Sequence, residues 1–129
     1  MPVLVTACPS FASRFAARAT NDYQDGNGDI LEYLALADLS RHILALIAAE
    51  HFNELPPTFA AVERLHVEGD KFVREAATGG LLEALQNHAG RCELEESRVT
   101  TWLGPQTRKW WDRLDNFWAG DAEALREVN

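Results

Sequence analysis

Apolar side chains recur every three or four residues along most of this chain, which is the spacing of one face of an α-helix. The pattern predicts helices over 9–20, 29–52, 58–67, 70–89 and 105–120. Segment 91–103 mixes residues that favour strands with residues that favour helices, and we interpret it as a short helix. Short loops between helices make neighbouring helices antiparallel. We therefore expect an all-α bundle of five to seven helices with mostly antiparallel neighbours.

Proline, glycine and capping residues predict where these helices begin and end. Pro56 and Pro57 are expected to end the second helix, with Thr58 capping the third. Gly69 predicts a break, because glycine is unfavourable inside a helix, and Asp70 predicts a new cap.

Two further glycine motifs predict local packing and a helix start. The pair Gly79–Gly80 lies inside a helical pattern, and we expect it to let a neighbouring helix approach closely. Gly104 and Pro105 predict the start of the last helix, because proline is tolerated at the first helical position.

The 129 residues fit one domain over 1–129, with residues 1–8 and 121–129 expected to be loosely attached. No apolar run reaches the ~18 residues needed to span a bilayer, so we expect no membrane association. Cys8 and Cys92 are too few for a disulfide framework, although one bridge between them stays open. A reducing, cytoplasmic location follows as the simplest interpretation.

The net charge of −8 is concentrated in the middle of the chain, where residues 20–70 hold ten acidic and two basic residues. A negative surface repels nucleic acid and attracts basic partners. The residues expected to form this surface are Asp22, Asp25, Asp29, Glu32 and Asp38. A solubilising role for the same charge is the simpler alternative.

The segment "DYQDGNGDI" (22–30) has the composition of a calcium-binding loop but fails its ligand pattern. With Gly28 at the sixth position, Tyr23 takes the place of the first acid and Leu34 that of the final glutamate. With Gly26 there instead, Asn21 takes the first place. We therefore predict a turn that leads into the second helix, without a bound metal.

A pocket of ionisable side chains is a second candidate site. Glu63 and His66 have the i, i+3 spacing of di-iron bundles, but only one such motif is present, so no metal site is expected. Together with Asp70 and Glu83 they could line an acidic pocket for a ligand or for acid–base chemistry. No nucleophile elbow or phosphate-binding loop occurs, so the sequence favours a protein without catalytic residues or cofactors.

The last long helix carries a broad aromatic face. Trp110, Trp111, Leu114, Phe117 and Trp118 recur at helical spacing. Such a face packs in the core, binds a protein partner, or joins two copies of the chain in a homodimer. Stacking of single-stranded nucleic acid is disfavoured by the acidic balance of the chain. Trp110 and Trp111 are the residues we expect at a partner interface.

Two motifs resemble those of a family of small bacterial proteins classed as a domain of unknown function. One is E-x6-D-x9-GLLExLQN, matched by Glu63, Asp70, Gly80, Leu81, Leu82, Glu83, Leu85, Gln86 and Asn87. The other is LGP-x4-WW-x6-W, matched by Leu103, Gly104, Pro105, Trp110, Trp111 and Trp118. The resemblance covers about residues 30–118 and implies no activity. By analogy, small acidic helical proteins of this kind resemble immunity proteins, which bind and block a toxin.

The sequence therefore supports three hypotheses about function. The first is a non-catalytic protein that binds and inhibits a basic protein partner, such as a toxin or an enzyme. The second is a small enzyme or ligand-binding domain built around the acidic and histidine pocket. The third is a structural homodimer joined through the tryptophan face.

Overall fold

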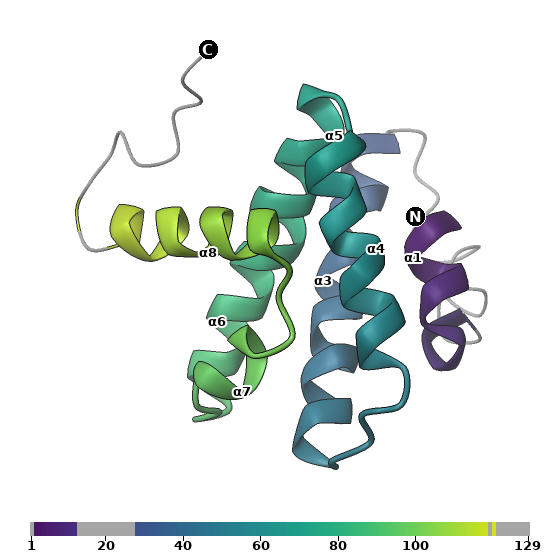
Figure 1. Ribbon diagram of the computed structural model, residues 1–129, viewed down its shortest axis with the longest axis vertical. Helices are drawn as coiled ribbons and strands as arrows, with labels where there is room; N and C mark the ends of the chain where they lie inside the picture. Colours follow the sequence, from purple (N-terminus) through teal and green to yellow (C-terminus); the bar gives the residue numbers. More distant parts are fainter. Residues whose placement is uncertain (1, 13–27, 119, 121–129) are drawn as a thin grey trace.

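The computed structural model describes residues 2–12, 28–118 and 120, and no strand occurs among them. The helices are α1 (Pro2–Ala7), α3 (Gly28–Ala48), α4 (Leu55–Glu68), α5 (Lys71–Glu75), the π-helical segment η1 (Ala76–Leu82), α6 (Glu83–Arg91), α7 (Ser97–Thr100) and α8 (Pro105–Trp118) (Figure 1). The all-α prediction is confirmed. None of the described helices is long and apolar enough to cross a membrane.

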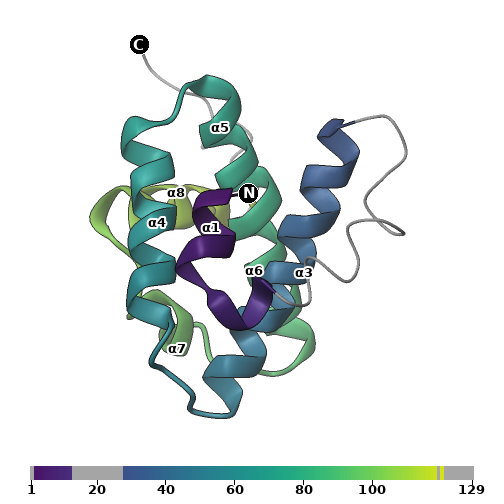
Figure 2. The ribbon, with the colours of Figure 1, turned by 90° about the vertical axis from the view of Figure 1, so that its right-hand side faces the viewer.

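The long helices pack around one hydrophobic cluster. α3 and α4 run in opposite directions, α8 lies across the bundle, and α1 lies against α4 (Figures 1 and 2). The cluster joins Leu4 of α1, Ile43 of α3, Phe59 of α4, Leu85 of α6 and Trp111 of α8, all of them buried. Burial of these side chains stabilises each helix through its apolar face, as the spacing in the sequence predicts.

The N-terminal segment is an integral part of the core. Leu4 and Cys8 are buried, so the prediction that residues 1–8 are loosely attached is wrong at these positions. Ser10 Oγ is hydrogen-bonded to His42 Nε2 at 2.6 Å, and the Ser10 N–H donates to Glu54 Oε1 at 2.8 Å. These bonds hold the segment against α3 and the start of α4.

Several predictions near the two ends of the chain have different outcomes. Residues 9–12 are helical, as expected for the start of the predicted helix 9–20. The rest of that helix, the rejected calcium loop up to residue 27, and residues 121–129 lie outside the described residues. Cys8 is buried and Cys92 is exposed, and both are free thiols, so the bridge between them does not form.

The helix α3 begins at Gly28, as the sequence predicts, but it ends at Ala48 instead of residue 52. Glu50 adopts a left-handed conformation with a φ of 59°. The His51 N–H then donates to the Leu46 carbonyl at 2.9 Å, which is the bond that closes a Schellman motif.

The prediction that the two prolines end the second helix is wrong, because they lie at the beginning of α4. Pro56 and Pro57 lie in the first turn of α4, where their missing N–H groups have no helical partner. The N-cap residue is Glu54, and the predicted cap Thr58 lies inside the helix. Its hydroxyl donates to the Glu54 carbonyl at 2.7 Å.

The strained ends of α3 and α6 give a testable prediction about stability. Glu50 and Glu93 have φ values of 59° and 56°, where a side chain costs roughly 1 kcal/mol that glycine avoids. We expect Glu50→Gly and Glu93→Gly each to raise the free energy of unfolding by about 0.5–1 kcal/mol in urea titrations. The control Ala48→Gly, at the end of α3, should lower it. Destabilisation by either glutamate substitution would contradict this expectation.

The break between α4 and α5 is confirmed. Asp70 caps α5 by accepting the Val73 N–H at 2.9 Å. A Cβ atom added at Gly69 would lie 2.4 Å from the Leu65 carbonyl oxygen, so only glycine fits this tight turn. The helix break at Gly69 therefore has a steric cause in addition to the low helix propensity of glycine.

From Lys71 to Arg91 the chain is helical without interruption, and its middle is η1. The Glu83 N–H donates to the Thr78 carbonyl, five residues back. Gly79 lies in η1, but a Cβ atom there would meet nothing within 4 Å. The expectation of a close helix approach at Gly79 is therefore wrong. Segment 91–103 contains α7 and no strand, as predicted.

Candidate functional site

The predicted acidic surface is only partly within the described residues. Asp22 and Asp25 lie outside them, and Asp29 and Glu32 lie in α3 with side chains that are not described. Asp38 is 4% exposed and forms an ion pair with Arg41 at 3.1 Å. Its assignment to an exposed surface was wrong, because Asp38 lies on the inward face of α3.

The predicted pocket of Glu63, His66, Asp70 and Glu83 does not form as a group of four. Glu63 and His66 share a hydrogen-bond network at the start of α8. Asp70 is exposed and caps α5, and Glu83 begins α6 outside that network. A shared acid–base site for these four residues is therefore not present.

Glu63 on α4 caps the N-terminus of α8. Its carboxylate accepts the Gln106 N–H at 3.0 Å, the Thr107 N–H at 2.8 Å and the Thr107 hydroxyl at 2.9 Å. These N–H groups have no partner within their own helix, and the helix dipole favours a negative charge there. A Cβ atom at Gly104 would lie 2.6 Å from the Glu63 carboxyl carbon. Gly104 is therefore required for this approach, and Pro105 adds no unpaired N–H.

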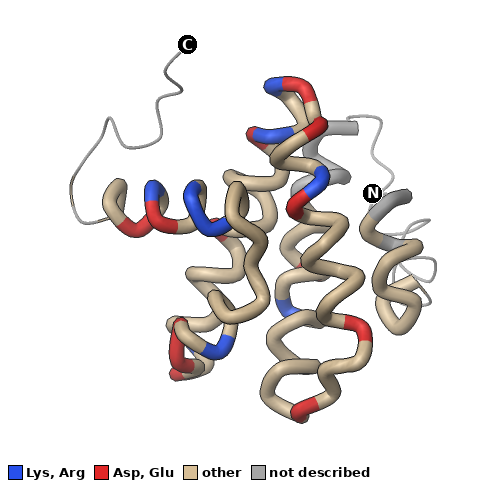
Figure 3. Tube along the Cα trace, viewed as in Figure 1, with Lys and Arg blue, Asp and Glu red and all other residues tan. Residues whose placement is uncertain are grey.

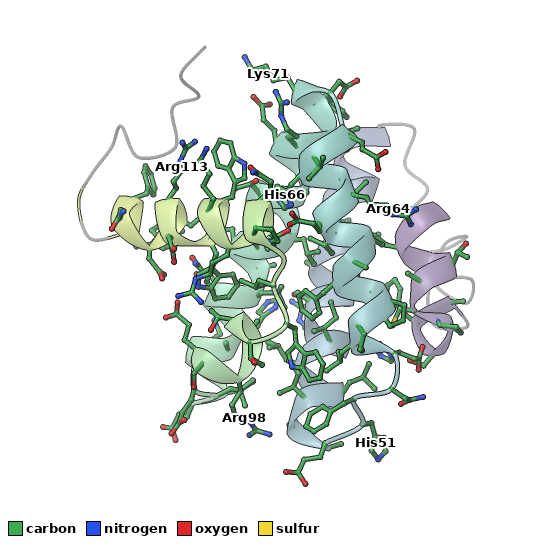
Figure 4. The ribbon with its side chains drawn as sticks, viewed as in Figure 1. His51, Arg64, His66, Lys71, Arg98 and Arg113 are labelled. Atoms are coloured by element: carbon green, nitrogen blue, oxygen red, sulfur yellow. The ribbon has the colours of Figure 1, made fainter. Side chains whose placement is uncertain are left out.

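His66 connects this cap to η1 (Figure 4). Its Nδ1 lies 3.1 Å from both the Val62 carbonyl and the Thr107 hydroxyl oxygen, and its Nε2 lies 3.1 Å from the Thr78 hydroxyl. Because a carbonyl only accepts, Nδ1 carries the proton and the Thr78 hydroxyl donates to Nε2. Burial lowers the pKa of His66, which keeps the ring neutral.

The pKa of Glu63 is also lowered. Partial burial acts to raise it, but the N–H groups of Thr107 and Gln106 and the Thr107 hydroxyl outweigh that effect. The network of Glu63, Thr107, His66 and Thr78 has all its partners inside the protein. Its role is to hold α4, α8 and η1 together.

A different site lies between α6, α7 and α8. A partly open pocket of about 260 Å³ is present there, and we call it the α6–α8 pocket. It is lined by Gln86, Asn87, Ala89, Gly90, Glu96, Trp111, Asp115 and Trp118. Acidic positions of α8 lie on the side facing α6 and α7 (Figure 3), and Asp112, one of them, is paired with Arg108 one turn earlier in the helix.

Two carboxyl groups meet in the α6–α8 pocket. Glu96 and Asp115 are hydrogen-bonded to each other, and the Trp111 indole N–H donates to Glu96. The Gln86 amide donates to Asp115 at 3.1 Å, and the Trp118 indole N–H donates to the Gln86 carbonyl at 2.9 Å. The pocket is thus rich in acceptors, and its two indole N–H groups and the Gln86 amide N–H groups are already engaged.

Below about pH 7 the two carboxyl groups share one proton. Burial, followed by the hydrogen bond to Glu96 and the charge of Glu96, raises the pKa of Asp115 to about 7. The hydrogen bonds from Asp115 and Trp111 lower the pKa of Glu96. Asp115 therefore holds the proton and donates it to Glu96. Such a pair can release its proton when a positive group approaches.

The tryptophan predictions are corrected in detail. Trp111 is 1% exposed, and it contributes to the site only as part of the lining of the α6–α8 pocket. Trp110 is half-buried, and the guanidinium of Arg113 lies 4.5 Å from its ring centre. The exposed indole is that of Trp118, at 52%.

Sequence reasoning did not select Glu96 or Asp115 as site residues. The available signal is that Trp111, Asp115 and Trp118 are spaced by four and three residues, which places all three on one face of a helix. Gln86 and Asn87 of the GLLExLQN motif face the same pocket. Within the described part of the chain, no group of three or more His, Cys, Asp or Glu side chains is arranged to hold a metal ion.

Fold and site together define a small all-α protein with a carboxyl pair in a pocket beside its last long helix. Over residues 1–119 the chain matches the family described as a domain of unknown function (DUF7674), and it belongs to that family. The resemblance to a domain of unknown function is confirmed, and the match extends to the N-terminal segment. Comparisons with curated proteins and with solved structures give no significant match.

Proposed function

We propose that this chain is a non-catalytic binding protein that holds a basic protein partner through the α6–α8 pocket. The observation that carries the proposal is the exposed Trp118 indole beside the carboxyl pair of Glu96 and Asp115. Tryptophan is enriched at the centres of protein interfaces, where it supplies a large rigid contact area.

The charge of the chain supports a basic partner. A net charge of −8 attracts positive surfaces over distances comparable with the Debye length and speeds their association. Inhibition of a toxin or an enzyme, as immunity proteins perform it, is the form of binding that we propose. The pocket residues replace the predicted acidic surface of Asp22, Asp25, Asp29, Glu32 and Asp38 as the proposed contact.

Site-specific photocrosslinking in the source cells tests this proposal. A photoreactive amino acid at the exposed Asn87, which lines the pocket, is expected to capture one partner protein. Trp118→Ala should abolish that crosslink and weaken binding of the purified partner at least tenfold. The control position is Lys71, which is exposed on α5, away from the pocket.

Each outcome of the crosslinking experiment decides between the hypotheses. Capture of the same protein from Asn87 and Lys71, or capture that survives Trp118→Ala, overturns the pocket as the binding site. Capture of a second copy of the chain supports the homodimer in its place. Absence of any crosslink from Asn87 rejects the proposal.

A further inference from the structure

We propose that the α6–α8 pocket binds a guanidinium group, supplied by an arginine side chain of the partner. This inference rests on the proposed function, because it names the group that the partner inserts. It is carried by the size of the pocket, by its surplus of hydrogen-bond acceptors and by the position of Trp118.

The volume of the pocket fits the end of one side chain. At about 260 Å³ it is smaller than the roughly 300–1,000 Å³ typical of sites for cofactors and drug-sized ligands. An arginine head group with its nearest methylene groups is of the right size for such a space. The open side of the pocket lets that side chain enter from a protein surface.

The hydrogen-bonding groups of the pocket favour a donor-rich cation over an anion. The Trp111 indole and the Gln86 amide already donate to Glu96 and Asp115. The nearby cation Arg108 is held by Asp112 at 3.0 Å. The carboxylate oxygens therefore carry the charge that a ligand meets in the pocket, and an anion would be repelled by them.

Guanidinium suits this site better than ammonium. Its planar array of five N–H donors can bridge two adjacent carboxylates, whereas an ammonium group is a compact point charge. Its flat face also stacks on indole, as Arg113 does over Trp110 on the same helix at 4.5 Å. Trp118 offers a half-exposed indole for this contact at the rim of the pocket.

Binding of the cation displaces the shared proton. Below about pH 7 Asp115 donates its proton to Glu96, and the pair carries a single negative charge. The other charged groups that act on Asp115 are Asp112 and Arg108 of α8. When guanidinium enters, the Asp115 proton passes to solvent and both carboxylates face the positive ligand. Binding should therefore strengthen as pH rises through 7.

Titration with small probes tests the inference on the intact protein. Nα-acetyl-arginine amide, followed by NMR of the Trp111 and Trp118 indole N–H signals, should bind saturably with a dissociation constant on the order of millimolar. Its affinity should fall about tenfold between pH 8 and pH 6, as expected if only the doubly ionised pair binds it. The neutral isostere Nα-acetyl-citrulline amide should not bind.

Variants connect the signal to the carboxyl pair. Glu96→Gln and Asp115→Asn should each weaken binding of the arginine probe at least tenfold, and Asp115→Asn should also remove its pH dependence. Glu75→Gln is the control, since Glu75 lies exposed on α5 and pairs with Lys71. If Glu96→Gln fails to fold, Asp115→Asn alone decides the result.

The results separate this inference from the proposed function. Equal binding of Nα-acetyl-lysine amide overturns the preference for guanidinium, and affinity that is independent of pH overturns the proton release. An arginine probe that does not bind, while crosslinking from Asn87 still depends on Trp118, rejects the ligand and leaves the proposed function standing. A probe that binds without any crosslinked partner rejects the proposed function instead.

Discussion

Replacing Glu63 by alanine is expected to lower the free energy of unfolding by roughly 2–3 kcal/mol, more than an ordinary helix cap contributes. The carboxylate accepts two N–H groups and one hydroxyl at the start of α8. Without the carboxylate, the two N–H groups and the Thr107 hydroxyl lose their charged partner. The Thr107 hydroxyl, which is also hydrogen-bonded to His66, is then no longer held in place. Urea unfolding followed by tryptophan fluorescence measures the loss. Glu68→Ala, an exposed change on α4, should alter stability by less than about 0.5 kcal/mol.

The same site predicts a strong coupling between Glu63 and Gly104. Gly104→Ala alone forces the carboxylate away from α8, because the new Cβ atom would lie 2.6 Å from it. Once Glu63 is already alanine, that atom has no carboxylate to displace. A double-mutant cycle should therefore give a coupling free energy of about 1–2 kcal/mol. Additive losses would show that Gly104 acts through the backbone alone.

The parts of the fold that were predicted correctly depend on local patterns. Ile43, Leu81 and Leu114 repeat at helical spacing with their neighbours, and their burial in one cluster follows from that spacing. Asp70 was predicted correctly as a cap, because its carboxylate accepts the N–H of Val73, which is only three residues away. In both cases the partners lie within one or two helical turns.

The predictions that failed depend on partners distant in the sequence. Residues 1–8 were expected to be loosely attached and no helix was predicted there, yet the segment "PVLVTA" forms α1, because burial of Leu4 against the core outweighs the weak helix preference of its valines. Thr58 has the residue type of a cap, but it lies inside α4 with Ala7 as an additional hydrogen-bond partner. Tertiary contacts decided both outcomes.

The candidate site shows the same limit. Glu63 and His66 were selected for their spacing on α4, but the role of Glu63 depends on Gly104 and Thr107, which belong to another element. Asp115 is one of two aspartates on α8, and although its spacing places it on one face with Trp111 and Trp118, the local sequence does not show which residue it meets there. Only the fold brings Glu96 beside Asp115 and leaves Asp112 with Arg108.

Asp115→Asn is expected to stabilise the protein at pH 8 by about 1–2 kcal/mol, a value reduced for the solvent exposure of the site. The pKa of Asp115 rises from 3.8 to about 7 on folding, so the folded state binds more protons than the unfolded state between these values. The stabilisation that Asp115 provides is therefore complete below its unfolded pKa and is lost as pH rises through 7. Asparagine keeps the donor to Glu96 and the acceptor for Gln86 without this loss.

The gain from Asp115→Asn should thus grow between pH 5.5 and pH 8, as measured by urea unfolding at several pH values. Glu75→Gln is the control, because Glu75 is exposed on α5, pairs with Lys71 and is not among the charges that act on Asp115, so its effect should be the same at both pH values. A gain that does not depend on pH would show that the carboxyl pair does not share a proton. If Asp115→Asn also weakens binding of the arginine probe, Asp115 lowers the stability of the folded protein while it contributes to binding. That combination is expected of a functional residue that costs stability.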